Sequence, residues 1–176
     1  MAKVEVDFTQ YFEEFYSALR DTGLLLASLD ESGRPNAMTI GWGLLGTGWG
    51  LPLCVVLVRP SRYTYSCLEH TGDFTCNLPY PAQHEQALFC GTRSGREVDK
   101  FTECGFTPLP SEGIKSPGIA ECGLILECQV VQKNDVAPET FAPKVIEAAY
   151  PAGDFHRVYY GEILRALADE DFRERL

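Results

Sequence analysis

Residues 39–50 read TIGWGLLGTGWG, and this stretch decides between two fold classes. Its central part, residues 41–46, matches the G-x-G-x-x-G spacing of a dinucleotide-binding turn and follows the strand-like run NAMTI. Such a turn requires the glycines to open a helix, and an acidic residue roughly 20 positions later to bind the ribose. Here residues 47–52, TGWGLP, bring three more helix breakers, and residues 60–65, PSRYTY, contain no carboxylate. The sequence therefore predicts strands in place of a Rossmann turn.

The glycines of this stretch then have two remaining explanations. In a strand, glycine permits the close approach of another backbone or of a flat ligand. The alternative is a bulged hairpin turn that binds nothing. Motifs elsewhere in the chain are needed to distinguish a ligand site from a turn that binds nothing.

The length and composition of the chain limit its class. At 176 residues it is long enough for a sizeable core, and we expect a single domain over residues 1–176. The longest purely apolar run, residues 53–58, has six residues against the ~20 that span a bilayer, so no membrane segment is predicted. The N-terminus lacks the basic start and apolar run of a secretory signal. The sequence therefore predicts a cytoplasmic protein.

The seven cysteines are odd in number, scattered and without a C-x-x-C pair. This pattern predicts reduced, mostly buried thiols and neither a disulfide framework nor a metal site. Cys90 adjoins one of the motifs described below, where it either packs in the core or touches a ligand.

The charge of the chain is unevenly distributed. A formal net charge of −10 repels phosphate backbones, so we expect no nucleic-acid partner. Residues 59–100 are nevertheless neutral, because five acidic residues there are balanced by Arg59, Arg62, Arg93, Arg96 and Lys100. A neutral window in an acidic chain either holds one small anion or carries ordinary surface charges.

The order of predicted elements indicates a mainly β protein with flanking helices. Residues 9–21 have the apolar spacing of an amphipathic helix. Two strands then surround a turn at residues 32–35, and residues 51–58 form a buried third strand. Further helices are predicted at 61–72, 82–91 and 96–105, a strand at 74–79, long β-rich runs at 118–132 and 155–167, and a short helix at the C-terminus.

Two of the predicted helix starts have the composition of anion sites. In residues 59–65, RPSRYTY, Pro60 and Ser61 can begin a helix, with Arg59 and Arg62 beside it. In residues 90–101, CGTRSGREVDKF, residues 94–97 fit a capping box, and Lys100 follows one turn later. Together with a strand rich in Trp and Gly, these two starts predict a phosphorylated, flat cofactor.

Four segments of the chain resemble, in order, the flavoredoxin branch of the flavin reductase-like family. They are residues 36–69, 74–79, 89–101 and 158–164, and the resemblance extends from about residue 23 to residue 165. It implies an FMN-binding split β-barrel, antiparallel and Greek-key-like, closed and flanked by helices. It also implies a homodimer with the flavin near the dimer interface.

The resemblance further implies which residues bind the flavin. The family's ring-contacting strand matches Met38, Thr39, Ile40, Gly41 and Trp42, where main-chain groups of Thr39 and Ile40 would meet the polar edge of the ring. The phosphate and ribityl contacts would come from Arg59, Ser61, Tyr63, Thr64, Ser94 and Lys100, with further contacts from Arg62, Gly91, Thr92 and Gly95. Because the flavin carries the redox chemistry, no catalytic side chain is expected. His156, beside Tyr159 and Tyr160, is more readily explained as a structural or surface histidine.

Three functions follow from this reading. The first is an NAD(P)H-dependent flavin reductase, with NADH or NADPH as a transient donor to the bound FMN. The second is an electron carrier of the flavoredoxin type that serves a redox partner protein. The third is a structural barrel whose flavin site is vestigial.

Overall fold

The protein is built on an antiparallel β-sheet. The computed structural model describes residues 3–176, and its main sheet has eight strands. Seven of them follow the order β3-β2-β6-β9-β10-β5-β4, and β1 pairs with β10. The strands are β1 (Lys3–Glu5), β2 (Leu24–Leu29), β3 (Pro35–Ile40), β4 (Gly43–Gly48), β5 (Leu51–Val58), β6 (Asp73–Leu78), β9 (Leu124–Asp135) and β10 (Arg157–Asp169). A small second sheet pairs β7 (Pro108–Leu109) with β8 (Gly118–Ile119).

The barrel is open between β3 and β4, although the sequence led us to expect a closed one. These two strands end the strand order, and within residues 3–176 no ladder joins them. The helix α1 (Phe12–Asp21) lies at this gap, because a Cβ built on Gly41 would be 3.5 Å from the carbonyl oxygen of Leu19. A Cβ built on Gly43 would lie 3.7 Å from the Leu19 side chain. The gap is thus filled by helix packing and not by strand pairing.

The glycines of residues 39–50 serve this packing and one tight turn. The β4–β5 hairpin turns on two residues, Trp49 and Gly50, whose φ angles are 53° and 77°. Positive φ at both positions is typical of a type I′ hairpin turn. A Cβ on Gly43 would lie 2.9 Å from the carbonyl oxygen of Val55, and one on Gly48 would lie 2.6 Å from Leu53 Cδ1. Close neighbours within the protein therefore account for Gly43 and Gly48, and the hairpin turn accounts for Gly50.

The helices flank the sheet, mostly where the sequence predicts them. They are α1, α2 (Tyr63–Thr71), α3 (His84–Thr92), α4 (Lys100–Cys104) and α5 (Pro143–Ala149), with short 3-10 turns at Phe8–Tyr11, Pro81–Gln83, Pro138–Thr140 and Phe172–Arg175. Gly72 ends α2 with a φ of 70°, as its position predicts. The predicted helix over 96–105 is helical only in its second half, and α5 was not predicted.

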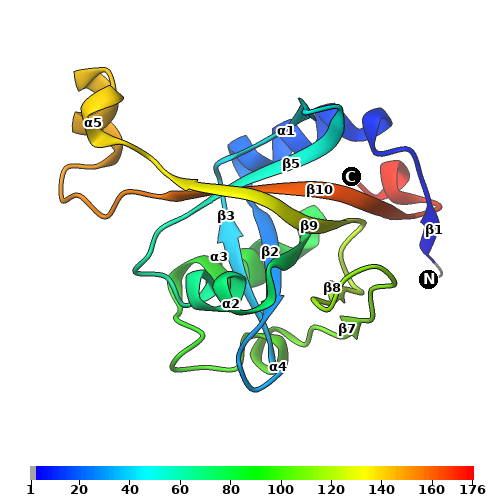
Figure 1. Ribbon diagram of the computed structural model, residues 1–176. Coiled ribbons are helices and arrows are strands. Elements are labelled where there is room, and N and C mark those ends of the chain that lie inside the picture. The colour runs from blue at the N-terminus through cyan, green and yellow to red at the C-terminus, as the bar shows by residue number, and fades with distance from the viewer. Residues whose placement is uncertain (1–2) are drawn as a thin grey trace.

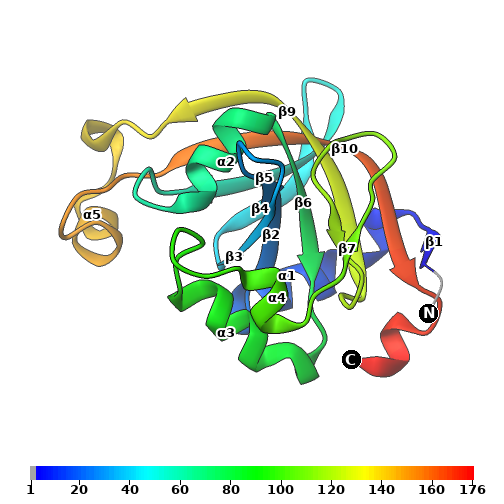
Figure 2. The same cartoon turned by 90° about the horizontal axis from the view of Figure 1, so that it is seen from below.

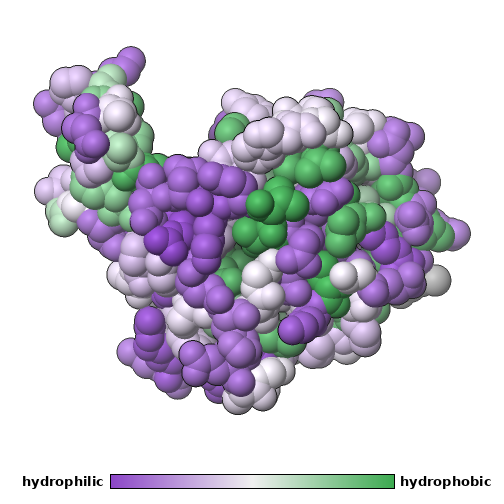
Figure 3. All heavy atoms as spheres, viewed as in Figure 1, coloured by the Kyte–Doolittle hydropathy of each residue, from purple (hydrophilic) through white to green (hydrophobic). Residues whose placement is uncertain are grey.

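One segment projects from the rest of the molecule. Figures 1 and 2 show α2, α3 and α4 together on one side of the sheet, and α5 at the far end of the extension formed by β9 and β10. The space-filling view shows this projection rising from the body with a recess beside it (Figure 3). Within residues 3–176, none of the helices has the length and apolar composition needed to cross a membrane.

Replacing Gly43 with alanine should lower the free energy of unfolding by about 1–3 kcal/mol, because the new methyl group meets the backbone of β5. Gly46 provides the matched control in the same strand, since within the described residues no heavy atom beyond its chain neighbours lies within 4 Å of a Cβ built there. Gly46→Ala should change the value by less than about 0.5 kcal/mol. Urea unfolding measures both variants, and equal effects would contradict the packing argument.

Candidate functional site

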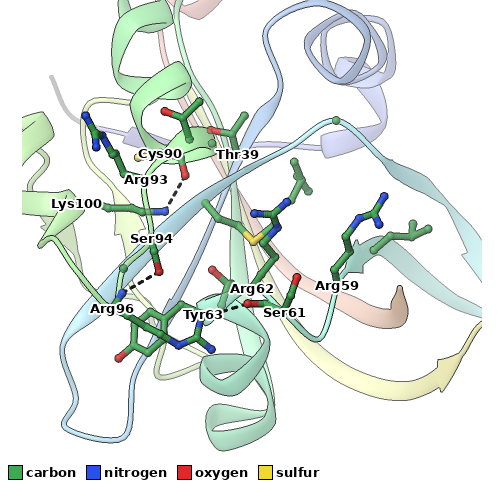
Figure 4. A pocket seen from close by; sticks show the side chains of 18 of the residues that line it. Thr39, Arg59, Ser61, Arg62, Tyr63, Cys90, Arg93, Ser94, Arg96 and Lys100 are labelled. Carbon is green, nitrogen blue, oxygen red and sulfur yellow. Dashed lines mark hydrogen bonds between the residues drawn. The ribbon is translucent and has the colours of Figure 1, made fainter. Parts of the chain in front are cut away.

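A pocket of about 360 Å³ lies where β3, the start of α2 and the segment from α3 to α4 meet. All fifteen residues that the sequence predicts for a flavin site line it: Met38, Thr39, Ile40, Gly41, Trp42, Arg59, Ser61, Arg62, Tyr63, Thr64, Gly91, Thr92, Ser94, Gly95 and Lys100. Five further residues line the pocket, namely Leu57, Cys90, Arg93, Arg96 and His156, and the resemblance assigned none of them to the flavin. The two segments predicted as anion sites, residues 59–65 and 90–101, are called the anion motifs below. Both contribute to the lining of this one pocket, as Figure 4 shows.

Arg96 joins the two motifs. Its Nη1 donates to the carbonyl oxygen of Ser61 at 3.2 Å, and its guanidinium lies 5.3 Å from the centre of the Tyr63 ring (Figure 4). A guanidinium over an aromatic face adds a favourable cation–π contact. The turn before α4 is therefore bound to the start of α2.

Gly95 allows this contact. A Cβ at position 95 would lie 2.1 Å from Asn36 Oδ1 and 2.6 Å from Tyr63 Cδ1, so no other residue fits there without a shift. Asn36 in turn donates from Nδ2 to Thr64 Oγ1 at 2.9 Å. Strand β3, helix α2 and the 94–96 turn consequently meet at a single point.

The buried carboxylate of Asp30 also stabilises the junction of β3, α2 and the 94–96 turn. Asp30 Oδ2 accepts hydrogen bonds from the Tyr63 hydroxyl at 2.9 Å and from Arg34 Nε at 3.1 Å. Arg34 Nη2 also donates to the carbonyl oxygen of Gly95 at 3.3 Å. Burial acts to raise the pKa of Asp30, but hydrogen bonds from Ser32, Arg34 and Tyr63 hold that pKa well below its ordinary value. Asp30 is thus held as the anion that orients Tyr63.

Both predicted helix starts are displaced in the structure. Helix α2 begins at Tyr63, because Pro60 and Ser61 form a turn closed by Arg62 N and the carbonyl oxygen of Arg59 at 3.0 Å. The predicted capping box at 94–97 does not form a helix start. Instead the backbone N–H groups of Glu97 and Val98 donate to the carbonyl oxygen of Ser94, in a turn.

The true cap of α4 is Asp99, whose Oδ1 accepts from Thr102 N at 3.1 Å. Asp99 lies five residues after Ser94 and matches the preferences of an N-cap equally well. The packing of Gly95 fixes the preceding turn, which leaves Asp99 as the first position free to start a helix. The prediction of Ser94 as a helix cap is therefore wrong, although Ser94 still lines the pocket.

Arg59 and Ser61 bind the loop before β10 as well as lining the pocket. Arg59 donates to the carbonyl oxygens of Ala149 at 2.9 Å and Asp154 at 3.1 Å, and Ser61 Oγ donates to Asp154 Oδ2 at 2.6 Å. Figure 4 shows the Arg59 side chain apart from Ser94 and Lys100. These bonds attach the base of the projecting segment to the rim of the pocket.

The pocket carries uncompensated positive charge. Five of its lining residues are Lys or Arg, and within the described residues its lining includes no Asp or Glu. Burial lowers the pKa of Lys100, and the positive charge of Arg62 lowers it further, while the thiols of Cys90 and Cys104 act in the opposite direction. Cations from the two motifs therefore repel one another across the pocket, and an anion bound between them would relieve that repulsion.

His156 forms an aromatic cluster at the other end of the pocket. Its Nδ1 pairs with the Tyr150 hydroxyl at 2.8 Å, and its ring lies 4.9 Å from the half-exposed ring of Trp42. Burial lowers the pKa of His156 to about 4, and the charge of Arg59 acts in the same direction. The imidazole is therefore neutral at physiological pH. The sequence placed His156 beside Tyr159 and Tyr160, whereas its hydrogen-bonding partner is Tyr150.

Fold and site together define a mainly β protein with a basic pocket beside an edge strand. The chain belongs to the flavin reductase like domain family, which matches residues 19–176. A flavoredoxin from Methanosarcina acetivorans has 28% sequence identity and a TM-score of 0.69, covering 85% of this chain and 70% of that one. A flavoredoxin of Desulfovibrio vulgaris (Miyazaki F) has 26% identity with the same coverage and TM-score.

Relatives of unassigned function match as well. A protein of Archaeoglobus fulgidus is 28% identical over 141 residues, which are 80% of this chain and 70% of that protein. The chain spans between 50% and 71% of the length of the curated relatives it matches. The fold shared with the solved flavoredoxins confirms the expected class, a split antiparallel β-barrel with flanking helices.

Stability should fall between pH 6.5 and pH 4 partly because of His156. In this window the unfolded chain binds a proton on the imidazole that the folded protein does not, so acid favours unfolding by up to about 3 kcal/mol. Urea unfolding at about pH 5 and about pH 7.5 should therefore show a smaller difference for His156→Asn than for the unsubstituted protein.

His70→Asn is the matched control, since His70 is an exposed histidine near the end of α2. It should retain the full difference between the two pH values. An unchanged pH dependence in His156→Asn would show that other groups cause the acid destabilisation.

Proposed function

We propose that this protein binds FMN in the basic pocket and acts as a flavin-dependent oxidoreductase. Membership of the flavin reductase-like family supports a flavin ligand. The observation that carries the proposal is the pocket itself, which combines five cationic side chains with the backbone of β3 and the ring of Trp42. A phosphate group suits the first environment and a planar ring suits the second.

The residues of the pocket fit the two ends of such a ligand. Arg62 and Lys100 would bind the phosphate, with Ser94 and the backbone around Gly91 beside it. Residues 38–42 would lie along the ring. The cavity of about 360 Å³ is within the range of small-molecule sites, roughly 300–1,000 Å³. The single domain that the sequence predicts stays part of this proposal.

The chain supplies binding and orientation. Bound FMN would provide two-electron hydride chemistry. Arg62 and Lys100 hold positive charge at one end of the pocket, and the neutral His156 adds no charge at the end near Trp42. We assign no catalytic side chain, because the bound flavin would carry the redox chemistry.

The proposal also concerns which molecule donates electrons to the flavin. We favour NADH or NADPH as a transient donor, which makes the protein an enzyme of the flavin reductase type. The second candidate is an electron carrier that serves a redox partner protein, and the likeness to two flavoredoxins supports it. A structural barrel without flavin is the third.

We also propose a homodimer in the cytoplasm. The β4–β5 hairpin exposes the apolar side chains of Leu44 and Trp49, which a second copy could cover. Seven free cysteines support a reducing compartment.

The apoprotein should bind FMN, and Arg62→Ala should weaken that binding about tenfold, the effect of losing a charge-assisted hydrogen bond. The same variant should bind riboflavin, which has no phosphate, as well as the unsubstituted protein does. Titration followed by flavin fluorescence gives both dissociation constants.

Arg20→Ala is the control, because Arg20 is an exposed cation paired with Asp21 on α1. It should leave both affinities unchanged. An equal loss for FMN and riboflavin in Arg62→Ala would remove the phosphate assignment, and an apoprotein that binds neither flavin would contradict the proposed function.

Anaerobic addition of NADH or NADPH to the FMN-loaded protein should bleach the visible absorbance of the flavin within seconds to minutes. Dithionite serves as the control that shows complete reduction. If dithionite bleaches the protein and neither nicotinamide does, the carrier function replaces the reductase function.

A further inference from the structure

Two thiols lie side by side at the wall of the pocket. Cys90 Sγ and Cys104 Sγ are 3.8 Å apart, on the packed helices α3 and α4. Cys90 lines the pocket and is 1% exposed, whereas Cys104, the last residue of α4, is only partly buried. A disulfide bond has an S–S length of about 2.05 Å, so the sulfurs would have to approach by less than about 2 Å. The two sulfur atoms are therefore in direct contact, as formation of a bond between them requires.

The surroundings give the two thiols different roles. Lys100 Nζ donates to the carbonyl oxygen of Cys90 at 2.7 Å, as the dashed line in Figure 4 marks. Burial raises the pKa of Cys90 to about 12. Burial also raises the pKa of Cys104, but the contact with Cys90 and the charge of Lys100 act against that rise. Cys104 is thus the more accessible of the two thiols, and the charge of Lys100 favours the thiolate of either one.

We propose that Cys90 and Cys104 are a redox-active pair that a small-molecule disulfide converts to a disulfide bond. The Cys104 thiolate attacks one sulfur of the small disulfide, which forms a mixed disulfide and releases one thiol. Cys90 then loses its proton to solvent and attacks Cys104 Sγ, which forms the protein bond and releases the second thiol. Two electrons pass from the protein to the small disulfide.

The bond would close the chain between residues 90 and 104 around one wall of the pocket. That wall carries Gly91, Thr92, Ser94, Gly95 and Lys100. A closed loop has fewer conformations, so the bond should hold the wall ready for its ligand. This second part rests on the proposed function, since the ligand in question is FMN. By linkage, FMN should favour the disulfide form by the factor by which the bond favours FMN.

The first experiment uses the apoprotein and does not depend on flavin. The protein is equilibrated with mixtures of oxidised and reduced glutathione, quenched with acid and alkylated in denaturant, and its peptides are identified by mass spectrometry. We expect a peptide linked through Cys90 and Cys104 at oxidising ratios. Free thiols at both positions throughout the series, or a bond to a different cysteine, would overturn the proposal.

Two variants support this measurement. Cys104→Ser should abolish the linked peptide. Cys67→Ser is the matched control, because Cys67 is a buried thiol of α2 that donates to the carbonyl oxygen of Tyr63, as a serine hydroxyl also can. Loss of the linked peptide in both variants would mean that the pairing is not specific to Cys104.

The second experiment compares FMN affinity in the reduced and oxidised protein. We expect the oxidised form to bind FMN about fivefold more tightly or better, and Cys104→Ser to bind equally under both conditions. Equal affinities in a protein that contains the bond would overturn the coupling to the pocket. Failure of both forms to bind FMN would instead remove the proposed function, while the linked peptide of the apoprotein would still establish the redox pair.

Discussion

The pocket depends on the contact that binds the 94–96 turn to the start of α2. Arg96 donates to the backbone of Ser61, and Gly95 fits against Asn36 and Tyr63 where any side chain would collide. This contact brings like charges together, which is unfavourable by itself. Hydrogen bonds to the Asp30 carboxylate offset part of that cost, because they hold Tyr63 and Arg34 in place. The walls of the pocket are therefore positioned by contacts within the protein itself.

The three walls of the pocket differ in how they are fixed. Strand β3 is held by its ladder with β2, and the start of α2 is held by the turn that follows β5. The third wall, between α3 and α4, contains little regular structure and depends on single side-chain contacts such as those of Arg96 and Lys100. Substitutions in the third wall would therefore alter the shape of the pocket more readily than substitutions in the other two walls. The thiol pair lies at the ends of this wall.

Local sequence signals predict much of the fold and less of the site. The run at 51–58, the turn before Pro35 and the glycine after α2 each specify their element, because the deciding interactions lie within a few residues. The meeting of the two anion motifs was predicted from their shared composition, and the family resemblance added the individual residues. Asp99 was missed as the cap of α4, since Ser94 fits the same local pattern and only the tertiary packing of Gly95 distinguishes them. The pairing of His156 with Tyr150 likewise depends on a loop whose shape local patterns do not determine.

The opening of the barrel has a consequence for what the pocket can recognise. Within the described chain β3 has a ladder partner on one side only, so it presents an outer row of amide and carbonyl groups along residues 38–40. In a closed barrel these groups would form hydrogen bonds with the neighbouring strand. If the proposed function holds, a heterocycle with alternating donors and acceptors along one edge would form hydrogen bonds with main-chain atoms of β3, and this recognition would tolerate side-chain substitution in the strand.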